Sequence, residues 1–278
     1  MILLAPQSVQ SLHTALEANT DATILAGGTD LLVKIRREQI YPDTIISLGS
    51  LGWNRIQRNQ STVEIGSMVT AAQLSTYDCS DVDVLSRAAS QVGGMQIRNM
   101  ATVGGNVVNA SPAADMALAL LALDADVTIM GRETERRVSL RDFFTGPGQT
   151  VLSTGEIVRS FQIPIRSNTT IQWFRKVGPR SRHFISRVAL AAVGTLENGT
   201  FSRIRIALGS VAPIPRRALQ TERYLKTVKL LGENEIETAA KIASSEDCSP
   251  ISDHRSSEEY RRRVVFNIIR EFLNECTV

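Results

Sequence analysis

Apolar residues recur along the chain with two periods, one typical of helices and the other of strands. Helical spacing predicts helices over residues 8–18, 84–92, 116–123, 233–244 and 256–276. Short apolar or alternating runs predict strands over residues 22–27, 43–48, 62–66, 124–130, 157–165, 188–196 and 203–211. The protein is therefore expected to mix helices with strands.

Several residues predict where these elements begin, turn or end. Ser8 is a candidate N-cap, and Ser111 followed by Pro112 is a candidate N-cap with proline at the first helical position. Asn198-Gly199 predicts a hairpin between the last two strands. The polar segment 166–170 is the best candidate linker, so the main boundary is placed there.

The final helix is predicted to be amphipathic. Tyr260, Val264, Ile268 and Phe272 repeat every four residues and predict its packing face. The adjacent run Arg261, Arg262 and Arg263 is either a solvated face or an anion site, and the solvated face is the favoured interpretation.

Composition narrows the class of protein. The 278 residues are 43% hydrophobic and 21% charged, with a net charge of +3, which suits a globular protein and does not demand a nucleic-acid partner. The start, MILLAPQSVQSL, has no basic leader, and no window approaches the roughly 18 apolar residues of a membrane span. A cytoplasmic protein is expected.

Catalytic and metal-binding patterns are scarce. Cys79, Cys248 and Cys276 are far apart and lack the CxxC spacing of zinc or iron–sulfur sites. The histidines show no HxxxH or HExxH spacing, and no GxSxG motif is present. We expect neither a metal site nor a catalytic side chain in this chain.

Two glycine-rich turns stand out instead. Ala26-Gly27-Gly28-Thr29-Asp30 follows a predicted strand, and Thr102-Val103-Gly104-Gly105-Asn106 precedes the apolar run at 116–123. Paired glycines let backbone N–H groups surround an anion such as a phosphate. Neither turn has the spacing of a Rossmann loop or a P-loop, and either one alone could be a plain tight turn.

Several motifs in order resemble the FAD-binding subunit of the molybdenum hydroxylases, a family that includes xanthine and carbon monoxide dehydrogenases. The motifs are AGGTDLLV at 26–33, QIRNMATVGGN at 96–106, ASPAAD at 110–115, FFTGPGQT, GEIVRSFQIP, FRKVGPR, RIALGSVAPIPRRA and SPISDHRSSEEYRRR. They span nearly the whole chain.

The resemblance implies an α+β fold. Residues 1–166 would form an FAD-binding domain of the vanillyl-alcohol-oxidase/MurB (PCMH) type, with subdomains at about 1–52 and 53–166. Residues 171–278 would form a smaller domain like the C-terminal domain of CO dehydrogenase flavoproteins, with an antiparallel sheet and helices.

The resemblance also implies a set of FAD-binding residues. The two glycine loops would hold the pyrophosphate, Asp115 would contact the adenosine part, Val33 would pack on the isoalloxazine face, and Val158 and Lys176 would contact the flavin. The residues carried over are Leu25, Ala26, Gly27, Gly28, Thr29, Asp30, Leu31, Leu32, Val33, Thr102, Gly104, Gly105, Asn106, Ser111, Asp115, Val158 and Lys176.

Three of these residues have plainer interpretations. Asp115 could be a first-turn helix acid, Val33 could be simple core, and Lys176 could be an exposed loop lysine. Residue types alone favour the core interpretation for Val33.

The implied function is electron transfer through FAD, with no catalytic side chain in the chain itself. Molybdopterin and 2Fe-2S clusters are expected only in partner subunits, NAD+ or another carrier would be the acceptor, and a dimer of heterotrimers is expected. Xanthine or another N-heteroaromatic compound is the preferred substrate of the complex. Two alternatives remain, a self-sufficient FAD oxidoreductase and a flavin-free scaffold.

Overall fold

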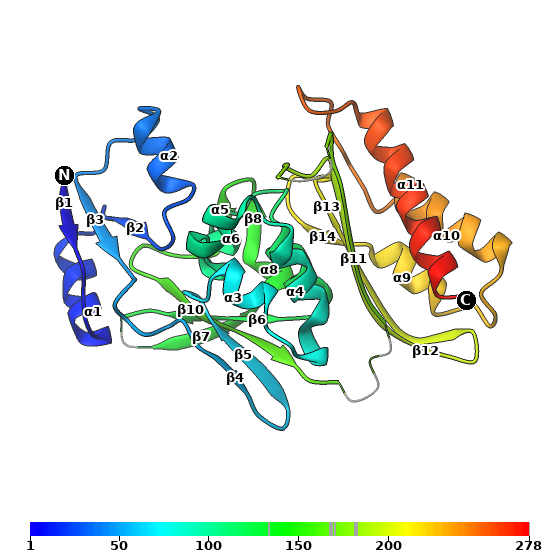
Figure 1. The fold of residues 1–278 in the computed structure, drawn as a ribbon, viewed down its shortest axis with the longest axis horizontal. Helices are drawn as coiled ribbons and strands as arrows, with labels where there is room; N and C mark the ends of the chain where they lie inside the picture. The colour runs from blue at the N-terminus through cyan, green and yellow to red at the C-terminus, as the bar shows by residue number, and fades with distance from the viewer. Residues whose placement is uncertain (133, 167–168, 170, 181–182, 278) are drawn as a thin grey trace.

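The computed structural model describes residues 1–132, 134–166, 169, 171–180 and 183–277. The N-terminal lobe, a central sheet with its helices, and a C-terminal sheet with its helices follow one another along the longest axis (Figure 1). The helices are α1 (Val9–Ala18), α2 (Leu31–Arg36), α3 (Ala71–Ser75), η1 (Ser80–Val82), α4 (Asp83–Ser90), α5 (Met95–Met100), α6 (Val103–Val108), α7 (Asp115–Ala122), α8 (Leu140–Phe143), α9 (Leu219–Leu225), α10 (Glu233–Ser245) and α11 (Glu258–Glu275). The strands are β1 (Ile2–Leu4), β2 (Thr23–Leu25), β3 (Thr44–Ser47), β4 (Ile56–Arg58), β5 (Thr62–Gly66), β6 (Asp126–Met130), β7 (Glu135–Ser139), β8 (Phe144–Gly146), β9 (Gln149–Thr150), β10 (Ile157–Pro164), β11 (Ile171–Val177), β12 (Val188–Glu197), β13 (Thr200–Gly209) and β14 (Arg216–Arg217).

The N-terminal lobe is a small parallel sheet in the order β1-β3-β2, with α1 packed on it. Leu12 of α1 and Ile46 of β3 are buried in the core of this lobe. Ser8 caps α1 through a reciprocal hydrogen-bond pair with Ser11, so the predicted N-cap is confirmed. β2 delivers the chain directly into the first glycine loop.

The central sheet is antiparallel in the order β4-β5-β10-β6-β7. β10 lies in the middle and pairs with both β5 and β6. A bulge between Val158 and Ser160 interrupts its pairing with β6. On the β5 side of β10, the Arg159 carbonyl accepts a hydrogen bond from the Ser67 amide, beside the second glycine loop.

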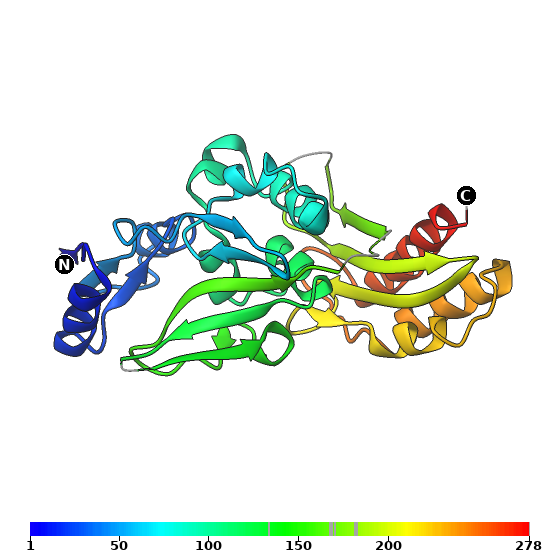
Figure 2. The same ribbon diagram turned by 90° about the horizontal axis from the view of Figure 1, so that it is seen from below.

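The C-terminal sheet is antiparallel in the order β11-β12-β13-β14, and α9, α10 and α11 cover one of its faces (Figure 2). Asn198 and Gly199 both have positive φ, 52° and 77°, at the turn between β12 and β13. That pair of angles suits a two-residue hairpin turn, so the predicted hairpin is confirmed.

The other face of this sheet packs against the first part of the chain. On β12, Leu190 and Ala192 belong to the core shared with α9 to α11, whereas Ala189, Ala191 and Val193 belong to the core shared with the central helices. All eight residues of α7 are buried between these layers. One hydrophobic cluster therefore contains residues from both sides of the predicted linker, whose residues 167, 168 and 170 lie outside the described part of the chain.

Two predictions about local structure are wrong. Ser111 is not the N-cap of the central helix, because α7 begins at Asp115 and Ala114 occupies the cap position. Ser111 instead accepts a hydrogen bond from the amide of Ala113 and closes a turn before the helix.

The arginine run on α11 is also not uniformly solvated. Arg261 is only 4% exposed and donates to the carbonyls of Arg187 and Ser210 and to Asp253. The helix is rotated from the predicted stripe, so Val265, Ile269 and Leu273 are buried together with Ile268 and Phe272, while Tyr260 is partly exposed. Arg263 alone among the three lies well out in solvent.

None of the helices in the described part of the chain is both long and apolar enough to cross a membrane.

Candidate cofactor site

The first glycine loop needs glycine at two positions for different reasons. Gly28 has φ of +71°, a left-handed conformation that favours glycine. A Cβ on Gly27 would overlap the carbonyl oxygen of Met100 at the end of α5. The loop is therefore held against α5 by close backbone contact.

The amides of this loop are available to a ligand. Within the described residues, the backbone N–H groups of Gly27, Gly28 and Thr29 donate to no protein acceptor. Successive free N–H groups in a tight turn form a concave site for anionic groups. Free amides in this arrangement are compatible with a phosphate group, the ligand part that the resemblance implies for this loop.

The second glycine loop is built differently. Thr102 caps α6 by accepting the Gly105 amide at 3.1 Å, and the Gly104 amide donates to the Ser67 carbonyl at 2.8 Å. A Cβ on Gly104 would lie 2.7 Å from the carbonyl oxygen of Ser67. Gly104 therefore permits close packing of α6 on the protein, and its N–H group is not free for a phosphate.

The two glycine loops adjoin. A Cβ on Gly105 would lie 3.9 Å from the Cβ of Ala26. Asn106 accepts the Ala117 amide through Oδ1 at 3.1 Å, which leaves its NH2 group as a donor. The structure thus brings together Ala26, Thr102, Gly105 and Asn106 as the sequence predicted.

A buried ion pair lies at the start of α7. Lys176 Nζ on β11 lies 2.6 Å from Asp115 Oδ2, and both side chains are less than a tenth exposed. Lys176 also donates to the Gln91 carbonyl at 3.1 Å, and the ring of Phe184 lies 5.1 Å from its Nζ. The exposed-loop interpretation of Lys176 is therefore wrong.

Asp115 retains an acceptor that the protein does not use. Its Oδ1 is buried and has no hydrogen-bond partner among the described residues. Burial raises the pKa of Asp115 to about 6, with the charge and hydrogen bond of Lys176 opposing the shift. A buried, unpaired carboxylate oxygen is costly, and a ligand hydroxyl or N–H group would satisfy it.

The ion pair brings together two residues that were predicted to contact different parts of FAD. The resemblance placed Asp115 at the adenosine part of FAD and Lys176 near the flavin ring or its ribityl chain. Because the two groups are 2.6 Å apart, they form one local site.

The remaining predicted residues lie either in β2 and α2, around the first glycine loop, or in the central core. Leu25 ends β2, Asp30 pairs with Lys34, and Leu31 and Leu32 begin α2. Val33 is 45% exposed on α2, so the core interpretation that its residue type favoured is wrong. Val158 is buried within the central core, so its side chain packs inside the protein.

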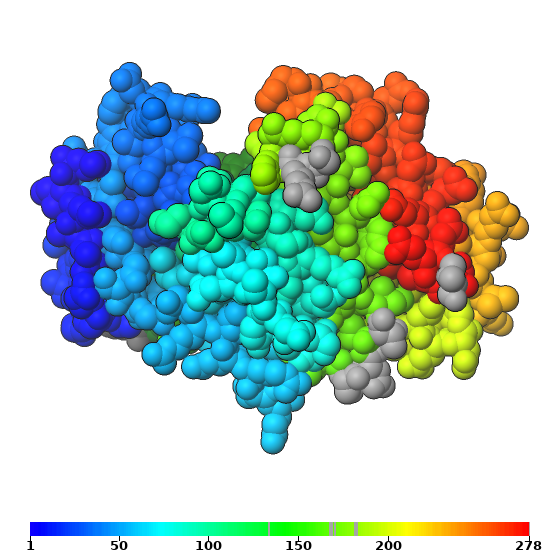
Figure 3. Space-filling model, in the orientation of Figure 1, coloured from blue at the N-terminus to red at the C-terminus, as the bar shows by residue number. Residues whose placement is uncertain are grey.

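A cavity of about 710 Å³ lies beside the ion pair. Gln91 and Arg98 line it from the central helices, and Lys176, His183 and Phe184 line it from the C-terminal part. Figure 3 shows a hollow in the upper outline of the molecule, between the blue N-terminal lobe and the lime and orange segments of the C-terminal part. α5 links this cavity to the first glycine loop, because its residue Arg98 lines the cavity and the carbonyl of its last residue, Met100, lies against Gly27.

Several residues of this region were not predicted. Ser67 is buried under Gly104, and its Oγ has no hydrogen-bond partner in the described part of the chain. Lys34 bridges Asp30 at 2.6 Å and Asn109 at 3.2 Å. The i, i+4 spacing of Asp30 and Lys34 was a usable signal for that pair. No sequence pattern indicated Ser67 or the Gln91 carbonyl.

Metal-ligand geometry is not found in the described residues, where no group of three or more His, Cys, Asp or Glu side chains could hold an ion. The polar groups at the site include loop amides, the Thr102 hydroxyl, the Asn106 amide and the Asp115–Lys176 ion pair. Groups of these kinds can bind and orient a nucleotide cofactor.

Comparisons with known proteins agree with this chemistry. Residues 1–166 match the family described as the FAD binding domain in molybdopterin dehydrogenase, and residues 173–276 match the CO dehydrogenase flavoprotein C-terminal domain. The chain is 32% identical over 262 residues to the glyceraldehyde dehydrogenase medium chain of Sulfolobus acidocaldarius, covering 93% of this chain and 92% of that protein. It is also 32% identical over 265 residues to the xanthine dehydrogenase FAD-binding subunit of Escherichia coli O157:H7, covering 93% and 89%.

Solved structures show the same fold. Carbon monoxide dehydrogenase from Hydrogenophaga pseudoflava aligns with a TM-score of 0.92 at 28% identity, covering 99% of this chain and 96% of that chain. Quinoline 2-oxidoreductase from Pseudomonas putida 86 aligns with a TM-score of 0.92 at 27% identity and the same coverage.

The fold and the site define an α+β oxidoreductase subunit whose cofactor is FAD. The chain belongs to the FAD-binding subunits of the molybdenum hydroxylase family. The predicted family, α+β fold and cofactor are thereby confirmed.

Proposed function

We propose that this chain is the electron-transfer subunit of a multi-subunit molybdopterin hydroxylase or dehydrogenase. It would pass electrons from 2Fe-2S clusters in a partner subunit through FAD to NAD+ or another acceptor. Bound FAD would supply the conversion between one-electron and two-electron transfer, which no side chain can provide.

The buried Asp115–Lys176 pair carries this proposal. Asp115 Oδ1 is an unused buried acceptor, and Lys176 holds the other carboxylate oxygen at 2.6 Å. The pair adjoins a cavity that Lys176 itself lines. We assign Asp115 to a hydroxyl or N–H group of FAD and Lys176 to holding Asp115 in place.

The other proposed contacts are hydrogen bonds to the pyrophosphate and packing against the isoalloxazine ring. The free amides of Gly27, Gly28 and Thr29 would meet the pyrophosphate, and the hydroxyl of Thr29 and the NH2 group of Asn106 would add hydrogen bonds. Val33, exposed on α2, would pack on the isoalloxazine ring. Val158 would contribute through its backbone, since its side chain lies in the core.

The names of the relatives support a proposal for the partners and the substrate. Relatives are named as medium chains or subunits of larger enzymes, including the nicotine 6-hydroxylase medium subunit of Paenarthrobacter nicotinovorans. We propose an iron–sulfur subunit and a molybdopterin subunit as partners, in a cytoplasmic dimer of heterotrimers. Xanthine or another N-heteroaromatic compound is the proposed substrate, supported by the relatives named for xanthine dehydrogenase and nicotine 6-hydroxylase.

Tagged purification from the native host tests the proposal. Stoichiometric FAD together with molybdenum, iron and two co-purifying chains is the expected result. Turnover assays on that complex with xanthine, nicotinate and glyceraldehyde then separate the substrate classes. A lone yellow chain without metals would instead indicate a self-sufficient oxidoreductase, and a lone colourless chain would indicate a scaffold.

A further inference from the structure

A second cavity, of about 310 Å³, lies at the junction of the two parts of the chain. Arg58 of β4, Arg166 after β10 and Arg205 of β13 line it. The cavity also has apolar walls from Leu123, Pro164, Ile165 and Val193, and one acidic residue, Asp81. It shares no lining residue with the cavity beside Lys176.

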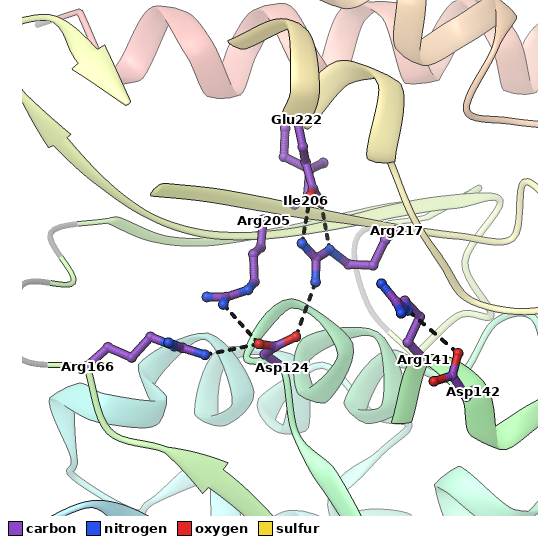
Figure 4. A network of polar contacts seen from close by, with 8 residues as sticks. All are labelled: Asp124, Arg141, Asp142, Arg166, Arg205, Ile206, Arg217 and Glu222. Atoms are coloured by element: carbon purple, nitrogen blue, oxygen red, sulfur yellow. Dashed lines mark hydrogen bonds and ion pairs between the residues drawn. The ribbon is translucent and has the colours of Figure 1, made fainter. Parts of the chain in front are cut away.

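The three arginines have more donors than the protein uses. Arg58 donates through Nε to Asp81 at 2.8 Å. Arg166 and Arg205 each donate through Nη2 to Asp124, at 3.0 and 2.9 Å (Figure 4). Each guanidinium carries five N–H donors, so Arg166 and Arg205 keep donors beyond the one that Asp124 accepts from each. Arg58, whose side chain is half exposed, can also donate to water.

One of these donors is buried. Arg166 Nε is inaccessible and has no hydrogen-bond partner among the described residues. Leaving a buried donor of a charged group unpaired costs free energy. Asp124, the carboxylate that Arg166 contacts, is shared with Arg205.

Around this cavity, the arginine side chains outnumber the carboxylates that pair with them. Arg217 also approaches Asp124, at 3.6 Å, but its other bonds are a bidentate pair to Glu222 (Figure 4). The two carboxylates Asp124 and Glu222 thus pair with three guanidinium groups, those of Arg166, Arg205 and Arg217. Asp81 neutralises the charge of Arg58. Burial, together with the charges of Arg166, Arg217 and Arg203, lowers the pKa of Arg205 against the opposing effect of Asp124.

We propose that this cavity binds one small oxyanion of the phosphate type, coordinated by Arg58, Arg166 and Arg205. Guanidinium groups recognise phosphate oxygens through paired N–H donors. The apolar walls leave room for an organic group attached to the phosphate. The ligand would link both parts of the chain, because Arg58 and Arg166 belong to the central sheet region and Arg205 belongs to the C-terminal sheet.

Isothermal titration of FAD-saturated protein with inorganic phosphate, at constant ionic strength, tests this site. Saturation with FAD first occupies the glycine loops, so they cannot account for phosphate binding. One saturable phosphate per chain is expected, with a rise in melting temperature on binding. A parallel titration with phenyl phosphate distinguishes two kinds of ligand. If inorganic phosphate binds as tightly as phenyl phosphate or more tightly, the site takes a free ion. If phenyl phosphate binds more tightly, the site takes a phosphomonoester.

The diagnostic variant is Arg58→Gln, because its ion pair is half exposed and its loss leaves the fold intact. It should weaken phosphate binding roughly tenfold, since a charge-assisted hydrogen bond is lost. Arg159→Gln is the matched control, because Arg159 forms a similar half-exposed pair with Glu135 and does not line the cavity. Absence of saturable binding in the wild-type protein, or equal weakening by both substitutions, would overturn the proposal.

Discussion

Lys176 and Asp115 form a buried ion pair with 2.6 Å between Nζ and Oδ2. Lys176 comes from β11 of the C-terminal sheet, and Asp115 is the first residue of α7. Their sequence positions are 61 residues apart, so the pair exists only because β11 is packed against the central helices. The pair therefore joins the two parts of the chain at the place where the cofactor site is proposed.

Replacing Lys176 by methionine should lower the free energy of unfolding at pH 8 by about 3–5 kcal/mol, because a buried carboxylate loses its partner. Urea unfolding followed by circular dichroism measures this change. Lys241→Met is the control, because Lys241 forms an exposed helical pair with Glu237. The two variants having equal stability would show that the Asp115 carboxylate does not depend on Lys176.

Asp115 should also make stability depend on pH. Burial raises its pKa to about 6, from a usual value of 3.8, so the folded protein keeps a proton that the unfolded chain has lost between those values. The free energy of unfolding should therefore fall as pH rises from about 4 to about 6, by roughly 3 kcal/mol in total, and this contribution should not change further at higher pH. Comparing the pH profiles of the wild type and Asp115→Asn isolates this contribution, and parallel profiles would contradict it.

Gly27→Ala should reduce FAD retention. A Cβ at this position would overlap the Met100 carbonyl, so the loop must move away from α5 and its amides lose their arrangement. Equilibrium dialysis of the apoprotein with FAD should show at least a tenfold loss of affinity, equivalent to about 1.4 kcal/mol. Gly49→Ala is the control, because its added methyl would make only an ordinary contact, at 3.5 Å from Ser47 Oγ.

Substitutions within the arginine run on α11 should have very different effects on the free energy of unfolding. Arg261→Met leaves Asp253 and two carbonyl groups without their buried donor and should cost about 3–5 kcal/mol of stability. Arg263→Met should change stability by less than about 0.5 kcal/mol, because its side chain is 71% exposed. Thermal unfolding of both variants tests this, and similar melting temperatures would contradict the buried role of Arg261.

Residue patterns predicted the longer elements well. The helices at α1, α4, α10 and α11 and the strands at β10, β12 and β13 follow clear apolar periods and local capping or turn residues. The short elements α5 and α6 were not predicted, because segment 95–108 is rich in Gly, Asn and Met and has no strong period. Their helices depend on tertiary contacts such as the bond from the Gly104 amide to Ser67.

The sequence allowed us to name the residues of the candidate site but not to predict how they contact one another. The glycine loops, Asp115 and Lys176 were all identified from motifs. No sequence pattern could show that Gly104 faces Ser67, that Lys176 holds Asp115, or that Arg261 is buried. Each of these facts depends on which elements pack together over long sequence separations, which local propensity does not encode.

The burial of α7 on every side bears on how the protein folds during synthesis. Its apolar residues are covered partly by β12 and β13, which emerge from the ribosome some 70 residues after α7 is complete, as chain positions show. Until those strands pair, part of the α7 surface remains open to solvent and to misassociation. The first 166 residues, although they match one family by themselves, therefore reach a closed core only after the hairpin of β12 and β13 has formed.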